Sequence, residues 1–230
     1  MTPSPNIWHW PDIYEVENTA QDRAGAIWVA VTEVADFRGL DVVDVGCGAG
    51  FHLPRFAAAA RSVVGIEPHP PLVELATARV AATPGVRVLR GLGQALPLPA
   101  DSADVVHART ACFFGPGCDD ALVEANRVLR PGGVLVVVDL DATRSGYGGW
   151  MRADLPHYDP VAVEAFFAAA GFCLRRVSTR WVFDRRTDLA AVLGIEFSPA
   201  VAARALSETS GLELEVAYRV HWRRRQLVSV

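Results

Sequence analysis

The strongest constraint on the fold is a regular alternation of short apolar runs and amphipathic segments between residues 40 and 140. Runs with the length and composition of buried strands occupy residues 40–46, 61–67, 86–91, 103–109 and 134–140. Helices are expected at 50–60, 71–82 and 119–130. Strands that alternate with helices form parallel, right-handed βαβ units. Near-continuous Val and Leu runs are typical of strands that are buried on both faces.

The rhythm changes after Asp141. Further elements are expected in this order: a glycine-containing loop over 142–159, a helix over 160–170, a strand over 173–183, two helices over 187–193 and 199–207, and a strand over 212–224. Ahead of the alternation, residues 21–34 are expected to form a helix. The predicted fold class is α/β: a doubly wound sheet of about seven strands, mostly parallel with one antiparallel strand near the C-terminus, and helices on both faces.

Composition narrows the classes of function. The 230 residues carry a net charge of −4, which disfavours a nucleic-acid binder. All 22 basic residues are arginine, so a lysine Schiff base is excluded. No apolar run reaches the ~18–20 residues of a membrane helix, and the N-terminus lacks signal-peptide features. The cysteines have no metal-binding spacing and are expected to be reduced thiols in a cytoplasmic protein: Cys47, Cys112, Cys118 and Cys173.

The stretch VVDVGCGAG, residues 42–50, places three glycines at alternate positions where the first strand gives way to a helix. Glycine permits positive φ and close approach of a ligand to the main chain, and the following helix points free N–H groups at that ligand. A dinucleotide turn of the GxGxxG type needs a third glycine at position 51, which is Phe51. Glu67 ends the second strand at about the offset from which an acid binds a ribose diol. The alternatives are a tight turn without a ligand and a solvated acid.

Taken together, DVGCGAG, the acid Glu67 and RVLRPGGVLVVVD (127–139) resemble the class I S-adenosylmethionine-dependent methyltransferases of the small-molecule type. The resemblance covers roughly residues 40–140, with a weaker similarity in EAFFAAAGF (164–172). It implies a Rossmann-like fold, S-adenosyl-L-methionine as cofactor and S-adenosyl-L-homocysteine as product. The domain organisation expected is one domain over 1–230, with an N-terminal arm or lid (1–39), a cofactor-binding core (40–141) and a substrate-side part (142–230).

The resemblance also implies roles for individual residues. The glycine turn passes the methionine and ribose parts of the cofactor, and Glu67 holds the ribose hydroxyls. In GLGQALPLP (91–99), Leu92 stands where the family has an acid, so main-chain groups at Gly93 and Gln94 are expected to serve the adenine. The segment HARTACFF (107–114) is expected to face the sulfonium. The cofactor-binding residues expected are Asp44, Gly46, Gly48, Gly50, Glu67, Gly93, Gln94, Arg109 and Tyr14; Arg109 serves equally well as a structural ion-pair partner.

Candidates for the acceptor side are less defined. The aromatic N-terminus is expected either to close the site as a lid or only to pack onto the sheet. The residues expected to bind substrate are Trp10, Phe113, Tyr147, His157 and Tyr158. A hydroxyl acceptor is expected to use a general base, whose candidates are His157, Asp141 and His107, in falling order, whereas an amine or carbanion acceptor needs little more than positioning. A loop cap for Asp141 and a hydrogen-bonded core position for His107 are the alternatives.

The leading hypothesis is methyl transfer from S-adenosyl-L-methionine to a small molecule at O, N or C. An NAD(P)-dependent oxidoreductase and a non-catalytic S-adenosylmethionine-binding module are the alternatives. The strand ending in HARTACFF has no acid for the metal of catechol-type enzymes, and no Asn/Asp-Pro-Pro-Tyr/Phe motif for base methylation follows it. We therefore expect a small-molecule acceptor, no metal, no nucleic acid, no membrane, a monomer or homodimer, and a bacterial origin.

Overall fold

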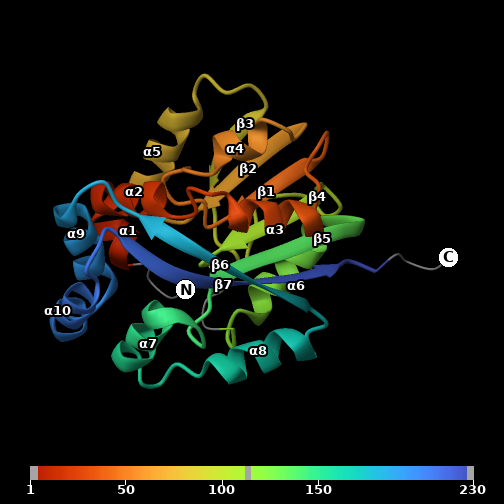
Figure 1. Cartoon of the computed structure of the whole chain (residues 1–230). Helices are drawn as coiled ribbons and strands as arrows, with labels where there is room; N and C mark the ends of the chain where they lie inside the picture. The colour runs from red at the N-terminus through yellow and green to blue at the C-terminus, as the bar shows by residue number, and fades with distance from the viewer. Residues whose placement is uncertain (1–4, 112–114, 227–230) are drawn as a thin grey trace.

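A seven-stranded sheet runs through the molecule in the order β3-β2-β1-β4-β5-β7-β6 (Figure 1). The computed structural model describes residues 5–111 and 115–226. The strands are β1 (Asp41–Val45), β2 (Ser62–Glu67), β3 (Val86–Arg90), β4 (Ala103–Arg109), β5 (Leu129–Leu140), β6 (Cys173–Val182) and β7 (Glu213–Arg224). β7 is antiparallel to both of its neighbours, and the other strands pair in parallel. The predicted fold class, including its one antiparallel strand, is confirmed.

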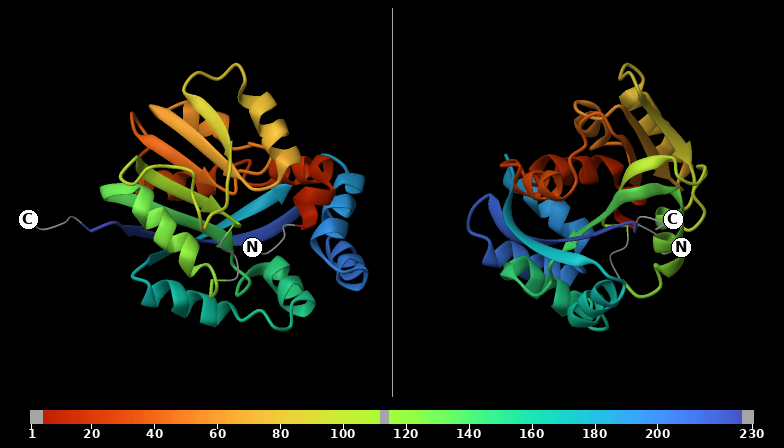
Figure 2. Two further views of the ribbon diagram at one scale, coloured as in Figure 1. Left: turned by 180° about the vertical axis from the view of Figure 1, so that it is seen from behind. Right: turned by 90° about the vertical axis from the view of Figure 1, so that its right-hand side faces the viewer.

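Ten helices are described: α1 (Pro5–His9), α2 (Pro11–Ala20), α3 (Ala26–Val34), α4 (Leu53–Ala57), α5 (Pro70–Val80), α6 (Asp119–Val128), α7 (Ser145–Asp154), α8 (Pro160–Ala169), α9 (Arg186–Glu196) and α10 (Pro199–Glu208). α3 lies on one face of the sheet and α6 on the other (Figures 1 and 2). α1, α2 and α9 gather at the carboxyl ends of the parallel strands, at the left of Figure 1. Of the helices in the described ranges, none combines the length and the apolarity that crossing a bilayer demands.

The expected loop over 142–159 is wrong in part, because α7 occupies its middle, Ser145–Asp154. The sequence did not predict this helix because SGYGGW contains three glycines, and glycine weakens an isolated helix. Tertiary packing forms it instead: Tyr147 contacts the rings of Trp181 and Phe197. Gly148 is required there, because a Cβ on it would lie 2.8 Å from the carbonyl oxygen of Ala142.

Two helix boundaries are also corrected. The expected helix over 50–60 is only α4, residues 53–57. The helix expected from Gln21 begins at Ala26, because Asp22 and Gly25 adopt positive φ, +49° and +74°. The chain therefore turns sharply between α2 and α3, and this turn separates the N-terminal helices from the sheet-covering helix.

Asp22 closes that turn with its side chain. Its carboxylate oxygens accept hydrogen bonds from the backbone N–H of Ile27 (3.0 Å) and of Trp28 (3.2 Å). The hydroxyl of Thr179 on β6 donates to the same carboxylate at 3.2 Å. The side chain thus satisfies free N–H groups at the start of α3 and ties this helix to the sheet.

We expect Asp22→Ala to lower the free energy of unfolding by about 1–2 kcal/mol, because it removes a helix cap and a link to β6. For a chain of this size the melting temperature should fall by roughly 2–8 °C. Thermal melting followed by circular dichroism measures this. Asp36→Ala, which removes an exposed aspartate paired with nearby Arg38, is the matched control and should change stability by less than about 0.5 kcal/mol. Equal melting temperatures for the two variants would contradict the capping role.

Candidate functional site

The glycine turn after β1 has the positive-φ backbone that its sequence predicts. Gly46, Gly48 and Gly50 have φ of +74°, +55° and +77°. A Cβ on Gly50 would lie 3.0 Å from the Cβ of Ala76, so α5 packs directly on the turn. Side chains are disfavoured at all three positions both by the positive φ and by close contacts.

Glu67 lies beside this turn at the end of β2 and is buried, with 4% of its surface exposed. One carboxylate oxygen accepts a hydrogen bond from the N–H of Gly48 at 3.1 Å, and the other from the N–H of His69 at 2.9 Å. Burial raises the pKa of Glu67, and the two backbone hydrogen bonds oppose the rise. The alternative of a solvated strand-end acid is wrong. The carboxylate is held at the turn and keeps unused lone pairs, so it can accept hydrogen bonds from a ligand diol.

Asp44 and His107 are paired in the core beneath the turn. Oδ1 of Asp44 lies 2.8 Å from Nδ1 of His107, and both side chains are about 5% exposed. The residues face each other across the β1–β4 pair, and the ring of Phe56 covers the imidazole at 5.1 Å. His107 is therefore a hydrogen-bonded histidine of the core, and Asp44 is its partner.

The N-terminal segment packs across the glycine turn. The Cδ1 atom of Ile7 on α1 lies only 2.7 Å from where a Cβ on Gly48 would stand. Ile7 forms a small apolar cluster with Ala49 and Leu72, and the ring of Trp8 stacks on His69 at 4.7 Å. α1 thus covers the carboxyl-terminal edge of the sheet at the glycine turn, where no side chains of the turn itself cover the main chain.

One face of α2 continues this cover toward β4. Tyr14 and Glu17 lie on the same face, three residues apart, and Gln21 caps the C-terminal end of the helix. Tyr14 is hydrogen-bonded to the side chain of Thr110 at the end of β4, and burial raises the pKa of Tyr14. The Gln21 amide donates to Glu17 at 2.6 Å and accepts from the guanidinium of Arg109 at 2.5 Å. Tyr14 and Arg109, both predicted from the sequence, are thereby brought together.

Two acids that the sequence did not mark complete this cluster. Glu17 is 3% exposed, and it lies against Glu196 at the end of α9. Glu196 accepts hydrogen bonds from the Asn6 amide at 2.6 Å and from the Tyr147 hydroxyl at 2.7 Å. Burial raises the pKa of both acids, and for Glu17 the adjacent Glu196 carboxyl adds to the rise. No motif surrounds either acid, so only the packing of α2 on α9 identifies them.

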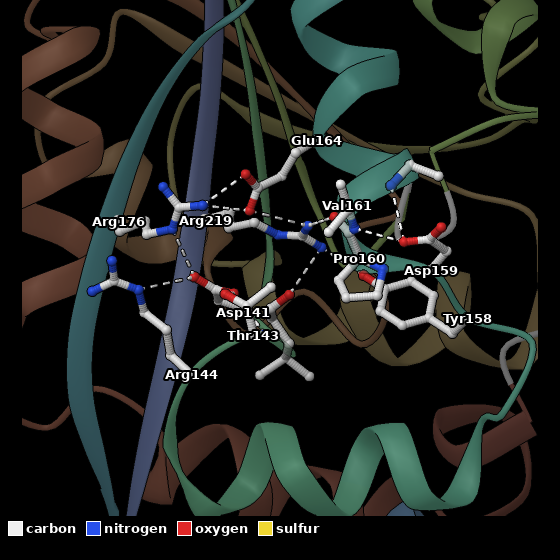
Figure 3. Close-up of polar contacts among 12 residues, drawn as sticks. Asp141, Thr143, Arg144, Tyr158, Asp159, Pro160, Val161, Glu164, Arg176 and Arg219 are labelled. Carbon is white, nitrogen blue, oxygen red and sulfur yellow. Dashed lines mark hydrogen bonds and ion pairs between the residues drawn. The ribbon is translucent and has the colours of Figure 1, made fainter.

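Asp141 and Tyr158 lie in a separate polar network under α8 (Figure 3). Asp141 accepts hydrogen bonds from the backbone N–H of Thr143 at 2.9 Å and from Nε of Arg176 at 3.1 Å. The Tyr158 hydroxyl accepts from the buried guanidinium of Arg219 at 2.5 Å. Asp141 is 1% exposed and fully engaged, so the loop-cap interpretation fits it better than that of a base.

Asp139 makes stability depend on pH. Burial raises the pKa of Asp139 to about 7, although the charge of Arg219 opposes the rise. The folded protein therefore keeps a proton that the unfolded chain loses near pH 4, and stability falls as pH rises from about 4 to 7.

We expect the free energy of unfolding to drop by up to about 2–4 kcal/mol between pH 5 and pH 8 through this group, and Asp139→Asn to remove that part of the slope. Urea unfolding at both pH values measures it. Asp12→Asn, at an exposed position on α2, should leave the slope unchanged. A slope that is the same in wild type and Asp139→Asn would contradict the assignment.

The remaining candidates are less central. Trp10 is 46% exposed at the start of α2, and His157 is exposed between α7 and α8, so neither is held in a site. Gln94 is exposed, and Gly93 lies next to Val45 at the end of β1. Phe113 lies outside the described residues. In the described parts of the chain, no group of three or more His, Cys, Asp or Glu side chains could hold a metal ion.

Comparison with known proteins agrees with this geometry. Residues 43–137 match the family model described as a methyltransferase domain. A curated relative from Mycobacterium ulcerans, named an uncharacterized methyltransferase, is 36% identical over 120 residues, which is 52% of this chain and 46% of the relative. The chain thus matches about half the length of such a relative.

Two solved structures share the fold. The YcgJ protein from Bacillus subtilis superposes with a TM-score of 0.64 at 16% identity, over 89% of this chain and 99% of that one. A methyltransferase dependent on S-adenosylmethionine from Thermotoga maritima, described as a possible histamine N-methyltransferase, superposes with a TM-score of 0.62 at 20% identity, over 96% of this chain and 99% of that one. At these identities the likeness establishes the fold alone.

Proposed function

We propose that this chain, which carries a methyltransferase domain of the class I type, transfers a methyl group from S-adenosyl-L-methionine to a small molecule at O, N or C and leaves S-adenosyl-L-homocysteine. The domain and its fold imply that cofactor. The observation that carries the proposal is the buried Glu67 carboxylate, bonded to the N–H of Gly48 inside the glycine turn. An acid in this position is suited to the two ribose hydroxyls of a nucleoside.

The residues at the site fit the cofactor. The bare main chain from Gly46 to Gly50 would pass its methionine and ribose parts, and Glu67 would hold the ribose. Gly93 and Gln94 would contact the adenine, and Tyr14 and Arg109 would contact the amino-acid end. When bound, the cofactor supplies an activated methyl group.

Because Ile7 packs on Gly48, we propose that α1 moves aside to admit the cofactor and then closes over it. The N-terminal arm would therefore act as the lid that its aromatic sequence suggested. Closure would exclude water and align the acceptor, and alignment alone is worth on the order of 7–11 kcal/mol. Asp141 and His107 would then serve as structural groups and not as bases.

The acceptor side would lie between α2, α7 and α9, where Tyr147 is buried against Trp181. An acceptor side enclosed by these helices would suit a small molecule better than a nucleic acid or a membrane surface. We further propose that the chain works in the cytoplasm as a monomer or homodimer. A dinucleotide-dependent oxidoreductase is disfavoured because Phe51 stands where a third glycine is needed.

Isothermal titration of the purified chain with S-adenosyl-L-homocysteine, with NADH and NADPH in parallel, tests the proposal. Micromolar binding of the thioether alone is the expected result. Binding of a dinucleotide without the thioether would overturn the proposal. Thioether binding without methyl transfer to any acceptor tried would favour the non-catalytic binding module.

A further inference from the structure

The N-terminal helices pack on α9 (Figure 1), and two carboxyl groups from distant parts of the chain meet there. Glu17 comes from α2 and Glu196 from the last turn of α9, and burial disfavours the charged form of each. Glu17 is buried and Glu196 is half-buried, and two such carboxylates in contact cannot both stay ionised without a cation between or beside them. The pair therefore requires a partner that carries positive charge or a proton.

The hydrogen bonds around the pair leave one oxygen without a donor. Gln21 donates to one oxygen of Glu17, and Asn6 and Tyr147 donate to Glu196. The second oxygen of Glu17 is buried and has no hydrogen-bond partner among the residues that the structure describes. It is directed at the other carboxyl group, which is itself an acceptor. A buried acceptor without a donor costs about 1–3 kcal/mol, so a proton held between the two carboxyl groups fills this gap unless a donor from outside takes its place.

The charges around the pair determine how much positive charge the donor must carry. Arg109 on β4 is the cation that acts on Glu17, and it is held by Gln21. The other ionisable groups facing the pair are the hydroxyls of Tyr14, Tyr147 and Tyr218, whose pKa values burial raises, so they stay neutral. Two carboxylates and one guanidinium leave one negative charge. A single proton neutralises it, and so does a single ammonium group.

The pair is placed beside the glycine turn by a short series of contacts. A Cβ on Gly46 would lie 3.0 Å from the Cβ of Ala111, so the end of β4 touches the turn. Thr110, in the strained region at φ +53°, is hydrogen-bonded to Tyr14, which lies one helical turn from Glu17. Aromatic rings stand on the far side, where Tyr147 packs on Trp181 at 4.9 Å. Carboxylates next to aromatic faces form a typical site for an organic cation.

We propose that Glu17 and Glu196 bind the ammonium group of the methyl acceptor, which makes the acceptor a small primary or secondary amine. This inference rests on the proposed methyl transfer. The ammonium ion displaces the proton that the pair shares and then gives one of its own N–H protons to the freed carboxylate. The nitrogen lone pair forms the new C–N bond to the cofactor's methyl group, and the electron pair of the broken C–S bond stays on sulfur.

The test is calorimetric and does not depend on turnover. The full chain, saturated with S-adenosyl-L-homocysteine, is titrated at pH 7 with benzylamine, 2-phenylethylamine and n-butylamine, and with benzyl alcohol, 2-phenylethanol and n-butanol. Two buffers of different ionisation enthalpy report proton release. We expect at least one amine to bind about tenfold or more tightly than its alcohol, with about one proton released per amine bound.

Glu17→Gln and Glu196→Gln keep the side-chain volume but remove one negative charge. Each should weaken amine binding about tenfold or more and abolish proton release, because no shared proton remains to be displaced. Glu15→Gln, on the same helix but paired with Arg79 at 2.8 Å, is the matched control and should change neither. Melting curves and thioether binding show whether each variant is folded, and Glu196→Gln serves if Glu17→Gln is not.

Failure of the thioether to bind would defeat the proposed function itself. Normal thioether binding combined with amines that bind no better than their alcohols would overturn only the amine site. Proton release that persists in both glutamine variants would do the same, since the proton would then come from another group.

Discussion

Glu67→Ala is expected to weaken the binding of S-adenosyl-L-homocysteine about 100-fold or more. The carboxylate can accept hydrogen bonds from two ribose hydroxyls, and a hydrogen bond to a charged group is worth about 1.5–3 kcal/mol. The substitution also leaves the N–H groups of Gly48 and His69 without their acceptor, so the turn loses its support. Isothermal titration of wild type and variant measures the change.

Glu74→Ala provides the control for this experiment, because Glu74 is an exposed glutamate on the neighbouring helix α5. The affinity of the Glu74→Ala variant for S-adenosyl-L-homocysteine should match that of the wild type within about twofold. Glu67→Ala with unchanged affinity would mean that the ribose binds elsewhere, and the glycine turn would then need another ligand. Melting curves of both variants separate lost binding from lost structure.

Arg219→Met is expected to lower the free energy of unfolding by about 3–5 kcal/mol. Arg219 has no exposed surface, and its guanidinium donates hydrogen bonds to the carbonyl oxygens of Pro160 (3.1 Å) and Leu140 (3.2 Å) and to the Tyr158 hydroxyl (Figure 3). The positive charge of Arg219 also opposes the rise in the pKa of Asp139 that burial causes. Removing one charge of such a buried network leaves its partners uncompensated, which is among the costliest of substitutions.

Urea unfolding at pH 7 measures the loss, with Arg224→Met as control because Arg224 is exposed on the same strand. The control should change stability by less than about 0.5 kcal/mol. The double variant Arg219→Met/Asp139→Asn should recover part of the loss, because both members of the opposite-charge pair are then neutral. A loss below 1 kcal/mol in the single variant would show that the network is not a major source of stability.

Local patterns identified the parts of the molecule that lie close together in the chain. The glycine turn with Glu67 was predicted from spacing, and the structure places that carboxylate against the turn. The strand order could not be read from the pattern, yet the number of strands and the single antiparallel one could. The glycine turn and Glu67 belong to one βαβ unit. The strands are recognised one at a time, from their own sequence period and burial.

The errors at α7, Tyr158 and Asp141 share one cause, which is packing between distant segments. α7 exists because Tyr147 and Trp150 are buried against residues from β6 and α9, in spite of its glycines. Tyr158 and Asp141 were expected near an open site, but Arg219 and Arg176 draw them into the network under α8. Helix propensity and loop position are weak guides where a tertiary partner is available.

The sequence by itself determined the α/β sheet, the positive-φ turn at Gly46–Gly50 and the acid that faces this turn. Each of these follows from backbone conformation and from residues that are neighbours along the chain or in adjacent strands. Only the tertiary structure decided that Asn6 would meet Glu196, a contact between residues 190 positions apart, and that Glu17 would join them. No local pattern encodes such a meeting. It arises because α2 and α9 bury their faces on each other above the strand ends, and burial then changes the protonation of the acids that they carry.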